Sequence, residues 1–349
     1  MATSMKAWAQ TEWGTGEGKL KVAEVERPAA GPRDLIVKIN AVATNPVDYK
    51  RQENFGNKDG KPAKPLIVGW DAAGVVEEVG SEVQFYKVGD EVYFAGNVLD
   101  QGCFAEYTKI DERLVGAKPT NLSFEEAAAI PLVSLTAWEA LIESAGLNIP
   151  LATPENPNPN EGKTLLITAG AGGVGSFATQ LAKKLLNIRV IATASREDSA
   201  AYCKKMGADD IIDHTKDFKE ELTRIGLEGV DYILNCTEPS KNMAQISNII
   251  KPLGKICLIN GDNALDVQAI FLKRVTLVFE FMSSRPLFGV ETEKQRDILN
   301  QVKELLENGT LVTTANTFLK WNQLEEALAL QVSGKAIGKT VLTVDWTQV

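Results

Sequence analysis

The stretch Thr168-Ala169-Gly170-Ala171-Gly172-Gly173-Val174-Gly175 is the most informative part of the chain. It follows a short apolar run, residues 164–167, and precedes a segment whose apolar residues have helical spacing, residues 177–186. Strand, glycine-rich turn and helix form the context in which a GxGxxG pattern predicts a dinucleotide site. Without that context, the pattern fits a chance glycine-rich turn equally well.

Each glycine of the pattern has an expected task. Gly170 permits the tight turn, Gly172 lets the backbone approach a pyrophosphate, and Gly175 lets the helix pack close to the strand. The free N–H groups and the positive dipole end of the helix then face the phosphates. We therefore predict a dinucleotide site at this turn.

The end of the next expected strand, residues 189–194, indicates which dinucleotide binds. NAD enzymes usually place an acidic residue about 20 residues past the glycines. Here Ser195 and Arg196 occupy that region, and the first acid, Glu197, follows them. A hydroxyl and a guanidinium would bind a 2′-phosphate, each charge-assisted bond contributing about 1.5–3 kcal/mol. The sequence favours NADPH, although Arg196 also fits a solvated residue at the start of the next helix.

Length and composition limit the class of protein. A chain of 349 residues can form two domains with substantial cores. The net charge of −9 gives no electrostatic footprint for nucleic acid or an anionic membrane. No apolar run is long enough to span a bilayer, and residues 1–14 lack the features of a secretory signal. We expect a cytoplasmic protein.

Cysteine and histidine usage excludes several kinds of site. The four cysteines, Cys103, Cys203, Cys236 and Cys257, form no CxxC pair and are typical of reduced thiols in a cytosolic compartment. His214 is the only histidine, so a histidine-rich metal site is impossible. No GxSxG motif accompanies it, which argues against a serine hydrolase.

The pattern of expected strands and helices changes near residue 163. Before it, short strands at 34–39, 74–79 and 91–94 predict a compact all-β unit, followed by helices at 124–129 and 136–143. Residues 148–162, rich in Pro and Asn, predict a surface loop that is more readily an inert insertion than a functional one.

After residue 163, strands and helices alternate, which predicts a parallel sheet of the doubly wound type. The expected strands are 164–168, 189–194, 211–213, 232–235, 255–259 and 276–281, with helices at 174–186 and 197–206. The tail predicts helices at 292–307 and 323–332 and a strand at 339–344. This order predicts domains of residues 1–130 completed by 291–349, and of residues 131–290, with the cofactor in the cleft between them.

Several motifs together resemble the medium-chain dehydrogenase/reductase superfamily over essentially the whole chain. Besides residues 169–175 they are Asn45-Pro46-Val47-Asp48, Gly69-Trp70-Asp71-Ala72-Ala73-Gly74, Val88-Gly89-Asp90-Glu91-Val92 and Ala128-Ala129-Ile130-Pro131-Leu132. The resemblance implies an α/β fold: a Rossmann doubly wound parallel sheet plus a GroES-like, β-rich catalytic domain.

The chain departs from the zinc-containing members of that superfamily. Where they carry a cysteine, a Gly-His-Glu histidine and a third ligand, this chain has Asn45, Trp70 and Leu132. Zinc needs three or four N, S or O donors. Their structural zinc lobe needs four cysteines, whereas residues 91–118 contain only Cys103. We therefore expect no metal site.

Without a Lewis acid, electron-poor acceptors such as quinones and the C=C bonds of enones and enals are the expected substrates. The chain is most similar to the zinc-free quinone oxidoreductases and the zinc-type alcohol dehydrogenase-like proteins. That resemblance implies a soluble, NADPH-dependent and commonly homodimeric reductase. Residues 275–282 fit a dimer edge or an ordinary buried strand.

The resemblance also implies roles for individual residues. Asn45 looks like the substrate-side residue at the nicotinamide, or a turn former before Pro46. The implied catalytic group is Asn45, Asp48, Tyr49 and Lys50, and the implied cofactor-binding group is Thr136, Gly170, Ala171, Gly172, Gly173, Val174, Gly175, Ser195, Arg196, His214, Gly338 and Lys339. A lone histidine such as His214 is also typical of a surface residue after a strand.

Two alternatives stay open. Enoyl thioester reductases of the superfamily use a tyrosine shortly after the Asn-Pro motif, and the nearest position here is Phe55, which has no hydroxyl. Some relatives are lens crystallins or bind RNA while retaining NADPH. The net charge of −9 argues against RNA, but the sequence does not test a crystallin-like role.

Overall fold

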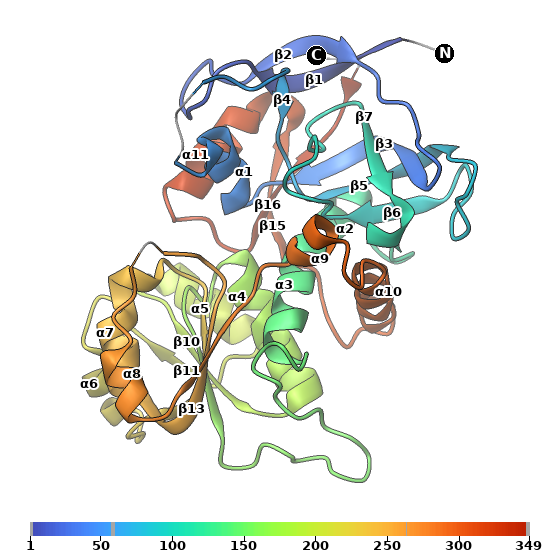
Figure 1. The fold of residues 1–349 in the computed structure, drawn as a ribbon. Coiled ribbons are helices and arrows are strands. Elements are labelled where there is room, and N and C mark those ends of the chain that lie inside the picture. The colour runs from blue at the N-terminus through green and yellow to red at the C-terminus, as the bar shows by residue number, and fades with distance from the viewer. Residues whose placement is uncertain (1–2, 57–59, 263, 347–349) are drawn as a thin grey trace. The chain divides into compact units, whose positions relative to one another are not determined.

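The computed structural model describes residues 3–56, 60–262 and 264–346 (Figure 1). The chain divides into two units. Unit 1 contains Met1–Leu132 and Ser283–Val349, and unit 2 contains Val133–Met282. The fold is mixed α/β, with a parallel sheet in unit 2 and a GroES-like sheet in unit 1, so the predicted fold class is confirmed.

The core of unit 2 is a six-stranded sheet in which every neighbouring pair is parallel. Its spatial order is β11 (Asp210–Ile212), β10 (Arg189–Thr193), β9 (Thr164–Ile167), β12 (Val230–Asn235), β13 (Ile250–Leu258) and β14 (Thr276–Phe279). All six expected strands are present. The order reverses direction at β9, which is the switch point where doubly wound sheets bind ligands beyond the carboxyl ends of their strands.

Helices cover both faces of this sheet. In Figure 1, α6, α7 and α8 lie together on one face, whereas α3 and α4 lie on the other. The helices of this part of the chain are α3 (Pro131–Leu141), α4 (Gly173–Leu181), α5 (Glu197–Lys205), α6 (Phe218–Arg224), α7 (Pro239–Ile249) and α8 (Gln268–Leu272). The helix expected at 174–186 is α4 followed by a π-helical turn, η3 (Ala182–Leu186). α3 begins at Pro131, earlier than expected, because proline suits the first turn of a helix.

Unit 1 contains two sheets. The larger has the order β15 (Ala315–Lys320), β16 (Lys339–Thr343), β3 (Asp34–Ala43), β5 (Ala72–Val79), β6 (Glu91–Phe94) and β8 (Val115–Ala117), with β7 (Tyr107–Asp111) paired to β3. The smaller has the order β2 (Lys21–Glu26), β1 (Ser4–Gln10) and β4 (Leu66–Ile67). β16 pairs antiparallel with β3, with Val341 opposite Ala43, so the C-terminal segment completes the larger sheet.

The expectation that the N-terminal part is all-β is wrong. α1 (Pro46–Gln52) follows β3, and a 3₁₀ turn, η1 (Asn54–Gly56), follows α1. Asn45 as N-cap, Pro46 in the first turn and an acid at Asp48 are ordinary helix-start signals. The remaining helices of unit 1 are η2 (Glu112–Leu114), α2 (Phe124–Ala128), α9 (Ser284–Phe288), α10 (Lys294–Glu307), η4 (Trp321–Gln323) and α11 (Leu324–Val332).

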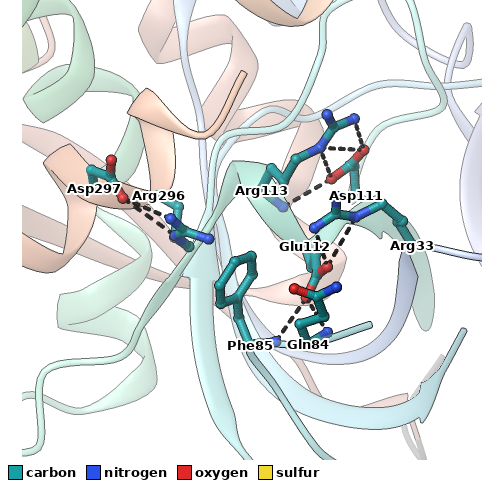
Figure 2. Close-up of polar contacts among 8 residues, drawn as sticks. All are labelled: Arg33, Gln84, Phe85, Asp111, Glu112, Arg113, Arg296 and Asp297. Atoms are coloured by element: carbon teal, nitrogen blue, oxygen red, sulfur yellow. Dashed lines mark hydrogen bonds and ion pairs between the residues drawn. The ribbon is translucent and has the colours of Figure 1, made fainter. Parts of the chain in front are cut away.

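A buried glutamate joins three segments of unit 1 (Figure 2). The Glu112 side chain is fully buried and accepts from the Arg33 guanidinium at 2.8 and 3.1 Å. Its other oxygen accepts from the backbone N–H groups of Gln84 and Phe85 at 2.8 and 2.9 Å. Burial opposes ionisation, but the N–H groups of Phe85 and Gln84 and the charge of Arg33 outweigh it and lower the pKa of Glu112.

Residues 148–162 form an irregular segment, as predicted, and Asn160 within it is buried and donates to the carbonyls of Pro150 and Leu186 at 2.8 and 2.6 Å. Across residues 3–56, 60–262 and 264–346, none of the helices combines the length and apolar character needed to cross a membrane.

Candidate active site and cofactor site

The glycine turn of unit 2 connects β9 to α4. Ala169 takes the left-handed backbone conformation of the turn, with φ of +49°. A Cβ on Gly170 would lie 2.6 Å from the Cβ of Ala192 in β10, so this glycine permits a close approach to the neighbouring strand. A Cβ on Gly175 would lie 2.5 Å from the carbonyl oxygen of Ala169. Gly175 therefore lets α4 pack close to the turn that follows β9.

The N-terminus of α4 supplies hydrogen-bond donors. Gly172 is the N-cap, and Gly173 and Val174 form the first turn, whose N–H groups have no intrahelical acceptor by helix geometry. A Cβ on Gly172 would meet only the carbonyl oxygen of Ala169, at 3.2 Å. The glycines leave space at the N-terminus of α4, and the N–H groups of its first turn are donors without an intrahelical acceptor. A pyrophosphate requires both the space and the donors.

The residues expected at the 2′-phosphate come together at the carboxyl ends of β10 and β11. Ser195 and His214 are exposed, and the Ser195 hydroxyl lies 3.5 Å from His214 Nε2. Arg196 is the N-cap of α5, and its guanidinium contacts Asp198 at 3.2 Å. Both side chains of that ion pair are substantially exposed, at 41% and 63%, so the pair holds the guanidinium only weakly.

The other three expected cofactor residues are divided between the two units. Thr136 is a buried residue of α3 in unit 2. Gly338 has φ of +60° and precedes Lys339, the first residue of β16, in unit 1. The Lys339 side chain is only 3% exposed, and all its described contacts are with residues of unit 1.

The polar centre of unit 1 is a buried triad of Asn45, Asp71 and Lys339. The Lys339 ammonium lies 2.9 Å from Asp71 Oδ2 and donates to Asn45 Oδ1 at 2.5 Å and to the Thr44 carbonyl at 2.6 Å. Asn45 Nδ2 donates to Asp71 Oδ2 at 2.8 Å. Asp71 Oδ1 accepts from the backbone N–H of Leu132 at 2.8 Å. Burial raises the pKa of Asp71, while Lys339, Asn45 and Leu132 lower it.

Asp48 lies next to this triad and is also fully buried. Its Oδ2 accepts from the backbone N–H of Asn45 at 2.6 Å, which caps α1. Its Oδ1 has no hydrogen-bond partner among the described residues. Burial raises the pKa of Asp48 to about 8, against the lowering effects of the Asn45 N–H and of Lys339. Tyr49 and Lys50 follow on α1 and are half-buried.

The side chains at the expected metal-ligand positions do not fit zinc. The Asn45 amide is bonded to Lys339 and Asp71, and Trp70 and Leu132 have no lone pair to donate. Trp70 belongs to the hydrophobic core, and its indole N–H donates to the Asn97 carbonyl at 3.0 Å. The described residues contain no group of three His, Cys, Asp or Glu side chains that could hold a metal ion. The cation beside Asp71 is an ammonium.

Sequence reasoning did not foresee that Asp71 and Lys339 form an ion pair. The available signal was an acid at Asp71 inside an apolar motif, because a buried carboxylate needs a cation or several hydrogen bonds. Nothing in the spacing of two residues so far apart identifies which lysine supplies the charge.

Residues 173–310 match the model of the family described as "Zinc-binding dehydrogenase", and residues 31–120 match that of the "Alcohol dehydrogenase GroES-like domain". A zinc-type alcohol dehydrogenase-like protein of Staphylococcus epidermidis is 37% identical, over 91% of this chain and 92% of its own. The 2-methylene-furan-3-one reductase of Solanum lycopersicum is 31% identical, over 97% of this chain and 79% of its own.

Several solved structures are similar to this chain. A putative zinc-dependent alcohol dehydrogenase from Rhizobium etli has a TM-score of 0.89 and 37% identity, covering 99% of both chains. A mycobacterial protein complexed with NADPH has a TM-score of 0.82 and 25% identity, covering 97% of this chain and 100% of its own. The chain belongs to the medium-chain dehydrogenase/reductase superfamily of oxidoreductases. Its relatives there are named zinc-type alcohol dehydrogenase-like proteins, quinone oxidoreductases and enone reductases.

Proposed function

We propose that the protein is an NADPH-dependent reductase that transfers hydride to quinones or activated alkenes without zinc. The observation that carries the proposal is the Asn45–Asp71–Lys339 triad. The family resemblance implies a metal-binding cysteine at position 45, and the amide that stands there is already bonded to an ammonium and a carboxylate. With no Lewis acid to polarise an alcohol or a ketone, acceptors that are already electron-poor are favoured.

The proposed cofactor is NADPH, which would supply a hydride from C4 of its nicotinamide ring. The N–H groups of residues 171–174 hold the pyrophosphate, and Ser195, Arg196 and His214 hold the 2′-phosphate. Support comes from the first turn of α4 and from the approach of Ser195 to His214 at 3.5 Å. The mycobacterial structure named above contains NADPH, which also supports this choice.

The contribution of unit 1 is to stabilise negative charge on the reduced acceptor. Hydride addition to an enone or a quinone leaves charge on oxygen, which a fixed N–H donor stabilises. Asn45 is the proposed donor, and the proposal places Asp48, Tyr49 and Lys50 on the same side of the substrate site. Catalysis comes chiefly from holding acceptor and nicotinamide in a reactive orientation. The proposed proton source is water.

The proposed assembly is a homodimer formed through β14. This strand lies at the edge of the six-stranded sheet, and it is not the fully buried strand that was the other expectation. Phe279 is 63% exposed at its end, and Phe281 just beyond it is 45% exposed. An apolar edge strand readily pairs with a second copy of itself, which also covers its exposed side chains. The four cysteines are free, in keeping with a reducing, cytoplasmic location.

The test of the proposed function is NADPH oxidation at 340 nm with a panel of acceptors: 9,10-phenanthrenequinone, 1,4-benzoquinone, an alkenal, crotonyl-CoA and a simple ketone. We expect turnover of the quinones or the alkenal, with NADPH preferred over NADH. Turnover of crotonyl-CoA alone would replace the proposal with an enoyl thioester reductase. Tight NADPH binding without turnover of any acceptor would indicate a non-catalytic, crystallin-like protein.

A further inference from the structure

Lys339 is a buried cation whose hydrogen-bonding capacity is fully used. An ammonium has three N–H donors. Its acceptors here are Asp71 Oδ2, Asn45 Oδ1 and the Thr44 carbonyl, at 2.9, 2.5 and 2.6 Å. The side chains of Lys339 and Asp71 are 3% and 0% exposed. No donor of Lys339 therefore remains for another ligand.

The ion pair determines the orientation of the Asn45 amide. An ammonium can only donate, so the amide group facing Lys339 must be the oxygen. A carboxylate can only accept, so the group facing Asp71 must be the nitrogen, at 2.8 Å. Rotation of the amide by 180° would place its NH₂ group against the Lys339 ammonium, where both groups are donors. It would also place its oxygen against the Asp71 carboxylate, where both groups are acceptors. The charges of Lys339 and Asp71 thus fix which atoms Asn45 presents.

The remaining capacity of Asn45 is one N–H. Nδ2 carries two hydrogens, and the Asp71 carboxylate takes one of them. The other contacts of Nδ2 are the carbonyl oxygens of Ala43 and Trp70, both at 3.5 Å, which is too long for a strong bond. This N–H therefore has no acceptor closer than 3.5 Å among the described residues.

Stability alone does not account for a buried ion pair in this position. Two desolvated charges often contribute less to folding than apolar side chains of the same volume. Three segments distant in sequence meet here: the start of β16, the N-cap of α1 and the residue before β5. The triad therefore fixes the Asn45 amide at the junction of these segments.

We infer that Lys339 is a positioning residue for the reduction: through Asp71 and directly, it holds the Asn45 amide with one N–H directed at the acceptor oxygen. This inference rests on the proposed function. Lys339 touches neither the acceptor nor the cofactor in this role, which differs from the cofactor contact expected of it from the sequence.

The test uses a charge-neutral double variant, Lys339→Met with Asp71→Asn, because Lys339→Met alone leaves an uncompensated buried carboxylate. The control is Lys335→Met, which removes an exposed lysine of the same segment. For the acceptor that the wild type turns over best, we expect kcat to fall at least tenfold in the double variant. The KM and dissociation constant for NADPH should stay within twofold of wild type, as should all constants of the control.

A folded double variant with wild-type kcat would overturn the inference, and so would a selective rise in the NADPH dissociation constant, which would make Lys339 a cofactor contact. NMR of ¹⁵N-asparagine-labelled protein tests the amide independently of turnover. We expect the Asn45 side-chain amide, assigned with Asn45→Ser, to exchange hydrogen slowly in the wild type and at least tenfold faster in the double variant. If no acceptor is reduced, the proposed function fails; an unchanged exchange rate would refute the positioning of the amide.

Discussion

Among single residues, Arg196 decides the expected choice between NADPH and NADH. Replacing it with glutamate would put a carboxylate against the 2′-phosphate and remove a charge-assisted bond of about 1.5–3 kcal/mol. We predict that Arg196→Glu raises the KM for NADPH at least tenfold and leaves the KM for NADH within twofold, measured by steady-state kinetics.

The control for Arg196 is Lys205→Glu, which changes the net charge equally at the other end of α5. It should affect neither cofactor. Equal losses with NADPH and NADH in Arg196→Glu would refute the assignment of the 2′-phosphate to this residue.

Asp48 makes folding depend on pH. Its pKa is raised to about 8 by burial, above its value in the unfolded chain, so the folded state binds the proton more tightly. The contribution of this group to stability is complete below about pH 4 and decreases as pH rises towards 8, with a limiting slope of about 1.4 kcal/mol per pH unit.

We predict that Asp48→Asn, which keeps an oxygen to cap α1, flattens the pH dependence of the free energy of unfolding between pH 4 and 8. Urea denaturation at several pH values would measure this. A variant as pH-dependent as the wild type would show that Asp48 is not the group responsible.

The roles of the site residues stay predictions. Ser195 was expected at the 2′-phosphate from its place after a strand and His214 near the adenosine phosphate from the family resemblance, and the two lie 3.5 Å apart. Asn45 was expected as a site residue, but not its bonds to Asp71 and Lys339. Local patterns identify residues at the ends of strands and helices, whereas a buried ion pair depends on tertiary packing that no spacing encodes.

At the scale of elements, the parallel sheet was predictable because its strands are short apolar runs separated by helical patterns. The six strands of unit 2 were all expected, with ends that differ by a few residues. The missed elements had weaker signals. β15 alternates between half-buried and exposed residues at a sheet edge, and α1 is a seven-residue helix among strands.

Glu112 forms a cluster with Arg33, Gln84 and Phe85 (Figure 2). This cluster holds the end of β7 to the segments before β3 and before β6. Replacing Glu112 with alanine leaves two backbone N–H groups and Arg33 without their acceptor. We predict a loss of about 2–4 kcal/mol in the free energy of unfolding at pH 7.

The loss in Glu112→Ala should diminish as pH falls. The lowered pKa of Glu112 means that its stabilisation is present above its unfolded pKa and is lost as pH decreases through the folded value. Glu82→Ala, an exposed glutamate of a neighbouring turn, is the control and should change stability by less than about 0.5 kcal/mol. An equal effect of both substitutions in urea titrations would contradict the role of the cluster.

The edge strand β14 gives a prediction about assembly. We expect the wild type to sediment as a dimer and Phe279→Lys, which puts a charge on the exposed edge, to sediment as a monomer with unchanged far-ultraviolet circular dichroism. Val88→Lys, at another exposed apolar residue, should remain dimeric. A monomeric wild type would show that the proposed dimer does not form. A dimeric Phe279→Lys variant would show that the interface does not lie at β14.

For the whole molecule, net charge and composition argue against some classes of protein but do not identify one. A net charge of −9 gives no basis for binding nucleic acid, and the ordinary composition only indicates a globular chain. Fold class and superfamily followed from the order of several motifs, and the comparisons confirm both. The acceptor could not be read from the sequence, because the residues around an acceptor lie on loops such as 51–65, of which 57–59 lie outside the described structure.

The most direct test of the central claim is the metal content of the active enzyme, measured by inductively coupled plasma mass spectrometry on the sample used for NADPH turnover. We predict zinc far below one atom per chain and turnover unchanged after treatment with a chelator, because Lys339 supplies the positive charge beside Asp71. One zinc per chain, whose removal abolishes turnover and whose return restores it, would show that the protein is a zinc enzyme.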